Sequence, residues 1–388
     1  MSAREAETVV VGAGVIGLAV SYELLLRGRG VLLLERDLPG LAASRVAAGM
    51  LAPISEAERE ESHRVELALD SKRRYPAFVA GLEARTGISC QYRTEGTLWV
   101  AVNRDQAEEL EALEATLRAK GLALVRLTAP EVLAREPRLT GRVAAGLFVE
   151  EDHQLDPRAL TRALEAAVRS LGGQIRGGFT VTDIPVTNGR VSSVRGVERA
   201  PGTGEGRAVE IGGETVVLAA GAWATETIRS PLADLGVRPV KGQMVRLRGE
   251  GLLRHVIRTP EVYFVPREDG ELLVGTTMEE QGFQDAPTAG GVMDILRHAW
   301  LVLPGIYDLD VGELSAGFRP AVRDHAPVVG ASGVPGLYAA IGHFRSGILF
   351  APATAHYLAE EMVTGKMPAA LAPFRAERLR DAARTAAR

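Results

Sequence analysis

The sequence is poor in cysteine, in aromatic residues and in long uncharged stretches. One cysteine among 388 residues excludes an internal disulfide framework, a CxxC redox pair and a cysteine-rich zinc site. A single thiol is compatible with a reducing cytosol, and the polar first residues, MSAREAE, do not resemble a signal peptide, so we expect a cytoplasmic protein. No apolar run reaches the roughly 18 residues of a membrane span, so we expect none.

Neither sign of charge dominates. The chain carries 45 Lys and Arg against 49 Asp and Glu, a formal net charge of −4. Because nucleic-acid-binding proteins normally carry a basic excess, we expect no nucleic-acid partner. The seven histidines form no HExxH motif and no pair four residues apart, and the chain has neither a P-loop nor a GxSxG motif. We therefore expect no metal site.

Glycine, by contrast, is abundant, with 43 residues. Such a content is typical of α/β folds whose tight turns approach a ligand closely. At roughly 150 residues per domain, the length predicts two or three domains. The first readable unit has an apolar run at Thr8–Val11, an expected helix at Ile16–Arg27 and a second apolar run at Val31–Leu34. This pattern predicts a buried parallel βαβ unit.

The strongest motif, GAGVIG at residues 12–17, lies between the first run and the helix. Gly12 permits the tight turn, Gly14 lets the backbone approach a pyrophosphate, and Gly17 lets the helix pack on the sheet. Glu35 ends the second run, where a carboxylate can accept hydrogen bonds from ribose hydroxyls. The unit therefore predicts dinucleotide binding, but it does not distinguish FAD from NAD.

Three other patterns predict local structure only. Leucines at helical spacing predict an exposed amphipathic helix over residues 105–120. Asp156 and Pro157 supply an N-cap and a first-turn proline for a helix that runs to Leu171. The glycine-rich residues 200–214 favour a surface hairpin.

Three segments further along the chain resemble a known family. They are AAGMLAP at residues 47–53, TVVLAAGAWA at 215–224 and LYAAIGHFRSGILFAP at 337–352. Together with the N-terminal unit, they resemble the FAD-binding segments of the D-amino-acid oxidase superfamily, and within it the glycine oxidases of thiamine biosynthesis. The most specific pieces are VYFVPREDGELLVGTTM at residues 262–278 and GHFRSGILFAPAT at residues 342–354.

The resemblance implies an α/β fold, in which a substrate domain with a mixed sheet (α+β) is inserted into a Rossmann-like FAD-binding domain. We place the FAD-binding domain at residues 1–85, 146–225 and 317–388, and the substrate-binding domain at residues 86–145 and 226–316. The residues expected at the cofactor are Gly12, Ala13, Gly14, Val15, Ile16, Gly17, Glu35, Arg36, Ser44, Ala47, Ala48, Gly49, Met50, Val181, Ala220, Gly221, Trp223, His343, Phe344, Arg345, Ser346, Gly347, Ile348 and Leu349.

The FAD is expected to be non-covalent. Some relatives that oxidise N-methyl amino acids attach flavin through a cysteine, but Cys90 lies in an apparent strand far from the flavin segments. We expect Cys90 to be a core residue.

The residues expected to bind the substrate are mainly arginines and a tyrosine. The planar fork of an arginine binds a carboxylate through two parallel hydrogen bonds. The resemblance implies that Arg319 and Tyr263 hold the substrate carboxylate, that Met278 lines the same pocket and that Arg345 lies beside flavin and substrate. Each could instead have a structural role, as an ion pair for the arginines or as packing for the other two.

The implied reaction is oxidation of glycine, or of sarcosine or D-alanine, by hydride transfer to flavin. An imine forms and hydrolyses to a 2-oxo acid and ammonia, and O2 becomes hydrogen peroxide. We assign no catalytic base. The resemblance also implies a homotetramer and hand-over of the imine to a thiazole synthase. Two alternatives remain: a dehydrogenase of D-amino acids or sarcosine with another electron acceptor, and a nucleotide-binding module without turnover.

Two residues depart from the family pattern and leave the substrate preference open. Glu261 stands where related glycine oxidases carry a histidine or another polar residue, so it either meets a substrate ammonium or faces solvent. Arg45 replaces the small residue that is common just before the AAGM run.

Overall fold

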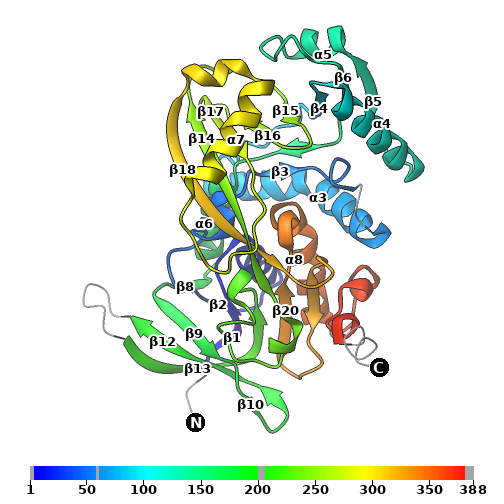
Figure 1. The fold of residues 1–388 in the computed structure, drawn as a ribbon. Coiled ribbons are helices and arrows are strands. Elements are labelled where there is room, and N and C mark those ends of the chain that lie inside the picture. Colours follow the sequence, from blue (N-terminus) through cyan, green and yellow to red (C-terminus); the bar gives the residue numbers. More distant parts are fainter. Residues whose placement is uncertain (1–3, 58–60, 200–205, 381–388) are drawn as a thin grey trace.

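The structure is a computed structural model that describes residues 4–57, 61–199 and 206–380. Figure 1 shows an elongated molecule with a sheet toward each end and helix α3 between them. The helices are α1 (Val15–Leu26), α2 (Ala43–Val46), α3 (Ser62–Thr86), α4 (Arg104–Ala119), α5 (Ala129–Arg135), α6 (Pro157–Ser170), α7 (Ala289–Val302) and α8 (Gly347–Thr364). Short 3-10 helices are η2 (Gly221–Trp223), η3 (Ala233–Leu235), η4 (Pro304–Asp308), η5 (Phe344–Ser346) and η6 (Ala369–Phe374).

The first sheet contains the predicted βαβ unit. Its central path follows the order β19 (Val328–Ala331), β20 (Leu337–Ile341), β13 (Gly206–Leu218), β1 (Arg4–Val11), β2 (Val31–Leu34) and β8 (Gln174–Arg176). From β20 to β8 all neighbours are parallel, whereas β19 is antiparallel to β20. Two antiparallel strands, β12 (Ser193–Arg199) and β9 (Phe179–Asp183), extend from β13. Residues 200–205 of the expected hairpin between β12 and β13 lie outside the described residues.

The central strands are buried on both faces, as continuous apolar runs require. Val10, Leu33 and Val217 face one side, where α1, α3, α6 and α8 pack against them. Val9 and Leu32 face the other side, against the β9–β12 extension and η3. The first sheet therefore sits between two apolar layers, which confirms the predicted α/β fold.

The second sheet is mixed. Its order is β18 (Asp310–Ala321), β14 (Arg238–Arg248), β17 (Glu271–Gly275), β16 (Tyr263–Pro266), β15 (Val256–Arg258), β4 (Thr97–Ala101), β6 (Ala145–Val149) and β5 (Val125–Thr128). All neighbours are antiparallel except β15 and β4. Two strand pairs stand apart: β3 (Met50–Leu51) with β7 (His153–Gln154), and β10 (Val186–Thr187) with β11 (Arg190–Val191).

The division into two domains stays a proposal. Strand β6 begins at Ala145, beside the boundary proposed at residue 146, and pairs wholly within the second sheet. Strand β18 runs through the boundary proposed at residue 317 and leads from the second sheet toward the first. Both proposed boundaries therefore fall within strands of the second sheet.

Two local predictions are confirmed in detail. The Asp156 carboxylate caps α6 by accepting hydrogen bonds from the backbone N–H groups of Arg158 and Ala159, at 2.9 and 3.1 Å. Helix α4 buries its leucines against the second sheet and leaves its charged face in solvent, as its 3.6-residue periodicity predicts. In the described part of the chain, none of the helices is both long and apolar enough to span a bilayer.

Candidate active site

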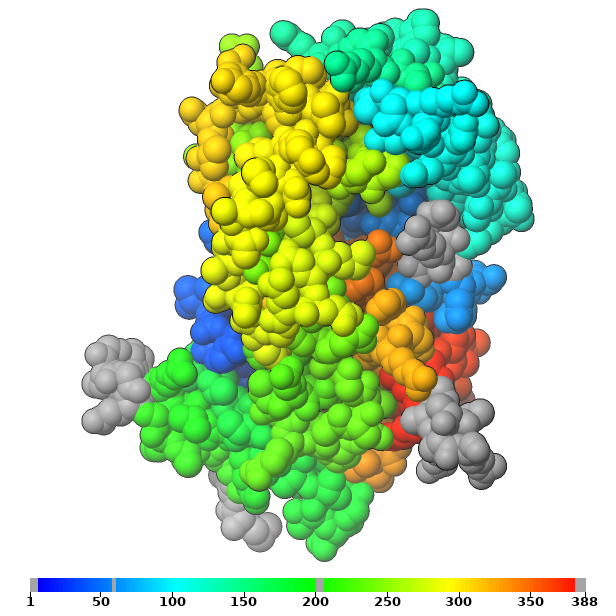
Figure 2. All heavy atoms as spheres, viewed as in Figure 1, coloured from blue at the N-terminus to red at the C-terminus, as the bar shows by residue number. Residues whose placement is uncertain are grey.

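A cavity of about 770 Å³ lies between the carboxyl ends of the first sheet's parallel strands and one face of the second sheet. This volume is in the range of small-molecule and cofactor sites, and strand ends of this kind are where α/β sheets bind ligands. In Figure 2 the surface is hollowed between the yellow segments on one side and the cyan segments on the other, above an orange segment. The residues that form the cavity come from widely separated parts of the sequence.

Most of the residues expected at the cofactor line this cavity. They are Gly12, Gly14, Val15, Ile16, Glu35, Arg36, Ser44, Ala47, Ala48, Gly49, Met50, Val181, Ala220, Gly221, Trp223, His343, Phe344, Arg345, Gly347 and Ile348. Ala13, Gly17, Ser346 and Leu349 are not among the lining residues and lie directly next to them in the chain.

The first glycines of the GAGVIG motif have the geometry that the motif predicts. Gly12 has a φ of +102°, and a Cβ there would come within 2.6 Å of the Ala219 carbonyl oxygen. A Cβ on Gly17 would come within 1.9 Å of the Gly12 carbonyl oxygen, so only glycine lets α1 lie this close to the turn. Gly14 is the N-cap residue of α1 and has no side chain between the helix N-terminus and the cavity. The turn is therefore open to a phosphate.

Glu35 lies at the carboxyl end of β2 and faces the cavity. Its Oε2 atom accepts a hydrogen bond from the backbone N–H of Ala13 at 2.7 Å, and its Oε1 atom accepts one from that of Asp37 at 3.1 Å. Each carboxylate oxygen keeps a lone pair for a further donor, such as a ribose hydroxyl. The guanidinium of Arg36 beside it lies 4.5 Å from the ring centroid of Trp223, which also lines the cavity.

Helix α8 points its N-terminus at the cavity. It begins at Gly347, Gly347 and Ile348 both line the cavity, and no side chain caps the helix or places an acid in its first turn. The positive end of the helix dipole is thus available to an anionic group. The carboxylate, the turn and the helix end together fit FAD: a ribose toward one end, a pyrophosphate in the middle, and at the other end a ring that gains negative charge on reduction.

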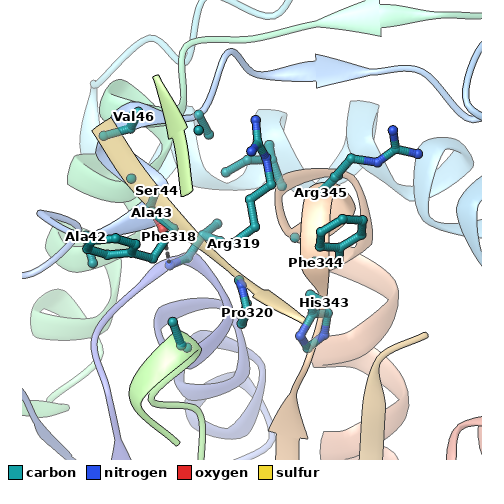
Figure 3. A pocket seen from close by; sticks show the side chains of 18 of the residues that line it. Ala42, Ala43, Ser44, Val46, Phe318, Arg319, Pro320, His343, Phe344 and Arg345 are labelled. Carbon is teal, nitrogen blue, oxygen red and sulfur yellow. Dashed lines mark hydrogen bonds between the residues drawn. The ribbon is translucent and has the colours of Figure 1, made fainter. Parts of the chain in front are cut away.

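Arg319 reaches the cavity from β18. Its Nη2 atom donates to the Thr276 hydroxyl at 2.9 Å, and Nη1 donates to the carbonyl oxygens of Lys241 and Thr277 at 3.3 and 3.2 Å. Burial lowers the pKa of Arg319, while Tyr263 raises it. In Figure 3, Arg319 extends from β18 and Arg345 from the turn before α8, so the guanidinium groups come from different elements.

The other residues expected at the substrate also line the cavity. The Tyr263 hydroxyl donates to the Met244 sulfur at 3.3 Å, and burial raises the pKa of Tyr263, so the phenol stays neutral at physiological pH. Met278 is 63% exposed and therefore lies toward the solvent side of the cavity. Arg345 is exposed, with its guanidinium 5.6 Å from the Phe344 ring centroid.

Comparison with known proteins agrees with this geometry. A family model described as FAD dependent oxidoreductase matches residues 7–361. The chain belongs to this family. It is therefore an FAD-dependent enzyme, and a nucleotide-binding module without turnover is not supported.

Two relatives show how far the similarity extends. The chain is 33% identical over 373 residues to a glycine oxidase from Geobacillus kaustophilus, covering 95% of this chain and 96% of that one. It is 35% identical over 384 residues to a bifunctional protein ThiO/ThiG from Trichormus variabilis, of which it covers only 56%. The chain thus spans about half the length of this larger relative.

Solved structures share the fold. The crystal structure of glycine oxidase from Geobacillus kaustophilus has a TM-score of 0.85 at 32% identity, and that of glycine oxidase from Bacillus cereus has the same score at 28% identity. Each comparison covers 95% of this chain and 98% of the other.

The sequence did not indicate several residues that line the cavity of this FAD-dependent enzyme. They are Glu56, Trp99, Gly242, Met244, Arg258 and Thr276, together with Leu110 and Leu113 of α4. Glu56 lies close to the AAGM segment, and Thr276 lies within the specific piece at residues 262–278, so these two could have drawn attention. The others lie on strands or helices whose neighbours come from distant parts of the sequence, so no local pattern marks them.

The two residues that depart from the family pattern lie in different places. Glu261 is exposed at the edge of the cavity and accepts hydrogen bonds from Gln106 at 2.8 Å and from the Thr259 hydroxyl at 3.2 Å. Arg45 pairs with Glu313 at 3.6 Å and is not a lining residue. Glu261 therefore faces solvent while anchored to α4, and Arg45 acts away from the cavity.

Cys90 is fully buried, as expected, but it lies in an irregular segment and not in a strand. Gln91 has a φ of +50°, which breaks an extended strand at this point. Burial raises the pKa of the thiol to about 12, so it stays protonated. Over residues 4–57, 61–199 and 206–380, no group of three or more His, Cys, Asp or Glu side chains could hold a metal ion.

Two buried arginines connect the second sheet to the AAGM segment. Arg246 donates to the Arg45 carbonyl oxygen at 3.3 Å and pairs with Glu271. Arg267 donates to the Ala48 carbonyl oxygen and to Gln154, and burial lowers its pKa to about 10. These contacts fix residues 45–48 against the second sheet, so that part of the cofactor wall is held by the sheet that carries Arg319.

Proposed function

We propose that this enzyme oxidises glycine, and small related amines such as sarcosine and D-alanine, with O2 as electron acceptor. The observation that carries the proposal is the position of Arg319, whose half-buried guanidinium on the second sheet lines the same cavity as the GAGVIG turn and the α8 N-terminus. The similarity to glycine oxidases over nearly the whole chain supports the same conclusion.

Arg319 binds the substrate carboxylate through paired charge-assisted hydrogen bonds, and the neutral Tyr263 hydroxyl adds a further donor. The fixed clamp orients Cα–H toward the cofactor and replaces the water that would otherwise solvate the carboxylate. Arg319 and Arg345 also disfavour the ammonium form of the amine, because like charges repel. Bound non-covalently, FAD supplies a two-electron acceptor that takes the α-hydrogen as hydride and passes the electrons to O2 as hydrogen peroxide.

The product is an imine, which water hydrolyses to the 2-oxo acid and ammonia. For glycine, the 2-oxo acid is glyoxylate. None of these steps requires a side chain to remove a proton from carbon, so we assign positioning roles to Arg319, Tyr263, Arg345 and Met278 and no catalytic base.

The proposal also covers the location of the enzyme, its oligomeric state and its partner. We infer a cytoplasmic homotetramer that hands the imine to a thiazole synthase for thiamine biosynthesis. Relatives named bifunctional protein ThiO/ThiG support this inference, because in those proteins the part similar to this chain is joined to a second activity in one polypeptide.

The test is replacement of Arg319 by Ala in the purified yellow protein. Losing a bidentate, charge-assisted contact should lower kcat/KM for glycine about 30- to 1000-fold, with FAD still bound by absorbance. Wild-type protein should lose its flavin absorbance when glycine is added without oxygen, and should release peroxide when air returns. Normal turnover by Arg319→Ala would overturn the clamp, and reduction without peroxide would indicate a dehydrogenase.

A further inference from the structure

An ion pair lines the substrate end of the cavity and has no part in the reaction above. Arg258, at the end of β15, donates from Nη1 to Oε1 of Glu56 at 3.3 Å. Their side chains are 13% and 17% exposed, and both residues line the cavity. Arg258 is also the cross-strand partner of Tyr263. The pair therefore lies beside the residues that hold the substrate carboxylate.

The pair is held in place from both sides. The Arg258 guanidinium lies 4.8 Å from the ring centroid of Trp99, and the Trp99 indole donates to the Ser55 hydroxyl at 2.8 Å. The backbone N–H groups of Ile54 and Ser55 donate to the fully buried carboxylate of Asp152, at 3.1 and 3.2 Å. Because the segment before Glu56 is anchored in this way, its carboxylate stays directed at Arg258.

The pair acts electrostatically on the carboxylate clamp. Glu56 opposes the burial that lowers the pKa of Arg319, and it adds to the burial that raises the pKa of Tyr263, while Arg258 works against that rise. Both charges are thus within electrostatic reach of a bound substrate. The positive charge of Arg258 and the negative charge of Glu56 nearly cancel. An amino-acid substrate with a single carboxylate therefore experiences little net electrostatic field from the pair.

A substrate with a second carboxylate meets a different situation. Arg258 is the cation that could bind that group, but Glu56 already occupies it. Glu56 itself would repel the group, and like charges brought together in a desolvated site cost several kcal/mol. We propose, on the basis of the proposed function, that Glu56 restricts the enzyme to monocarboxylate substrates by holding Arg258, and that Arg258 is a latent second anion subsite.

The experiment compares matched substrates that differ by one carboxylate: sarcosine with iminodiacetate, and D-alanine with D-aspartate. In Glu56→Gln, an isosteric change, kcat/KM for the dicarboxylate relative to its partner should rise about tenfold or more in at least one pair. The double variant E56Q/R258Q should lose that gain. The control is Glu261→Gln, which deletes a solvent-exposed carboxylate at the edge of the cavity. This variant should leave the dicarboxylate-to-monocarboxylate ratio of kcat/KM unchanged in both substrate pairs.

An unchanged ratio in Glu56→Gln, an equal rise in Glu261→Gln, or a gain that survives in E56Q/R258Q would each overturn the proposal. FAD content and the melting temperature establish that each variant is folded, and Glu56→Ala replaces Glu56→Gln if the latter is not.

A second readout requires no turnover. Acetate and malonate can be titrated into the oxidised holoenzyme and followed by the flavin spectrum. Wild-type protein should favour acetate, and Glu56→Gln should shift the preference toward malonate about tenfold; an equal preference in both proteins would overturn the inference. If glycine is not oxidised but this preference shifts, the proposed function fails while the role of Glu56 stands.

Discussion

The guanidinium of Arg319 lies directly over Gly242 on the neighbouring strand β14. A Cβ at position 242 would come within 2.3 Å of Nη1 and 2.4 Å of Nη2 of Arg319. The absence of a side chain at Gly242 therefore allows Arg319 to lie flat between the strands and reach Thr276. The orientation of the proposed carboxylate clamp therefore depends on this glycine as well as on the arginine.

Replacing Gly242 with Ala should displace the guanidinium and raise the KM for glycine about 10- to 100-fold, because small misplacements of a positioning group are costly. Steady-state peroxide assays measure the effect, and flavin absorbance should show FAD bound as in wild type. Gly290→Ala is the matched control, since a Cβ there meets nothing within 4 Å. A Gly242→Ala enzyme with an unchanged KM would show that the arginine is not constrained in this way.

Glu35→Ala should weaken FAD binding about tenfold or more. The change removes both a ribose acceptor and the acceptor of the Ala13 N–H group, and a lost hydrogen bond of this kind is worth about 1–3 kcal/mol. Titration of the apoprotein with FAD, followed by flavin fluorescence, measures the dissociation constant. At saturating FAD, kcat should stay close to wild type, and Glu35→Gln should be intermediate. Equal affinity in all three proteins would remove Glu35 from the cofactor site.

His343 should make the protein less stable in acid. The imidazole is fully buried and hydrogen-bonded to the Thr354 hydroxyl at 3.1 Å, and burial lowers its pKa to about 3. The unfolded chain therefore binds a proton below pH 6.5 that the folded chain rejects, so this contribution to stability is complete above pH 6.5 and is lost as the pH falls toward 3. Between pH 7 and pH 5 the loss is about 2 kcal/mol.

Urea unfolding at pH 7 and pH 5 tests this contribution against His343→Gln, which keeps a side chain that can bond to Thr354. The free energy of unfolding of the variant should fall less between the two pH values. The same fall in both proteins would show that His343 is not the group responsible.

The flavin should be released on denaturation. Cys90 is buried, its thiol is protonated, and it does not line the cavity. Acid precipitation should leave the yellow colour in the supernatant, and Cys90→Ala should retain FAD like wild type. Yellow colour that stays with the precipitated protein would show that the flavin is covalently attached and would contradict this prediction.

The sequence was most informative where function depends on a local turn. The strand predicted at Val31–Leu34 has these bounds in the structure, and the predicted helix at Ile16–Arg27 is shifted by only one residue. Backbone turns of the cofactor segments follow from neighbouring residues, so their glycines could be recognised directly. The roles of Gly242 and Arg258 could not be, because they arise from the pairing of β14 with β18 and the packing of β15 against the segment that carries Glu56.

The arginines of the second sheet also limit how the molecule can move. Arg246 and Arg267 are 1% and 6% exposed, and they donate hydrogen bonds to carbonyl oxygens in residues 45–48, the segment that follows strand β2 of the first sheet. A hinge opening between the sheets would break both hydrogen bonds; Arg246 would keep Glu271, but Arg267 would lose the Ala48 carbonyl oxygen as its acceptor, and leaving a desolvated cation short of partners is costly in free energy. We expect reactants to enter and leave through small shifts near the exposed Met278 and Arg345, while the two halves of the protein stay joined throughout each turnover.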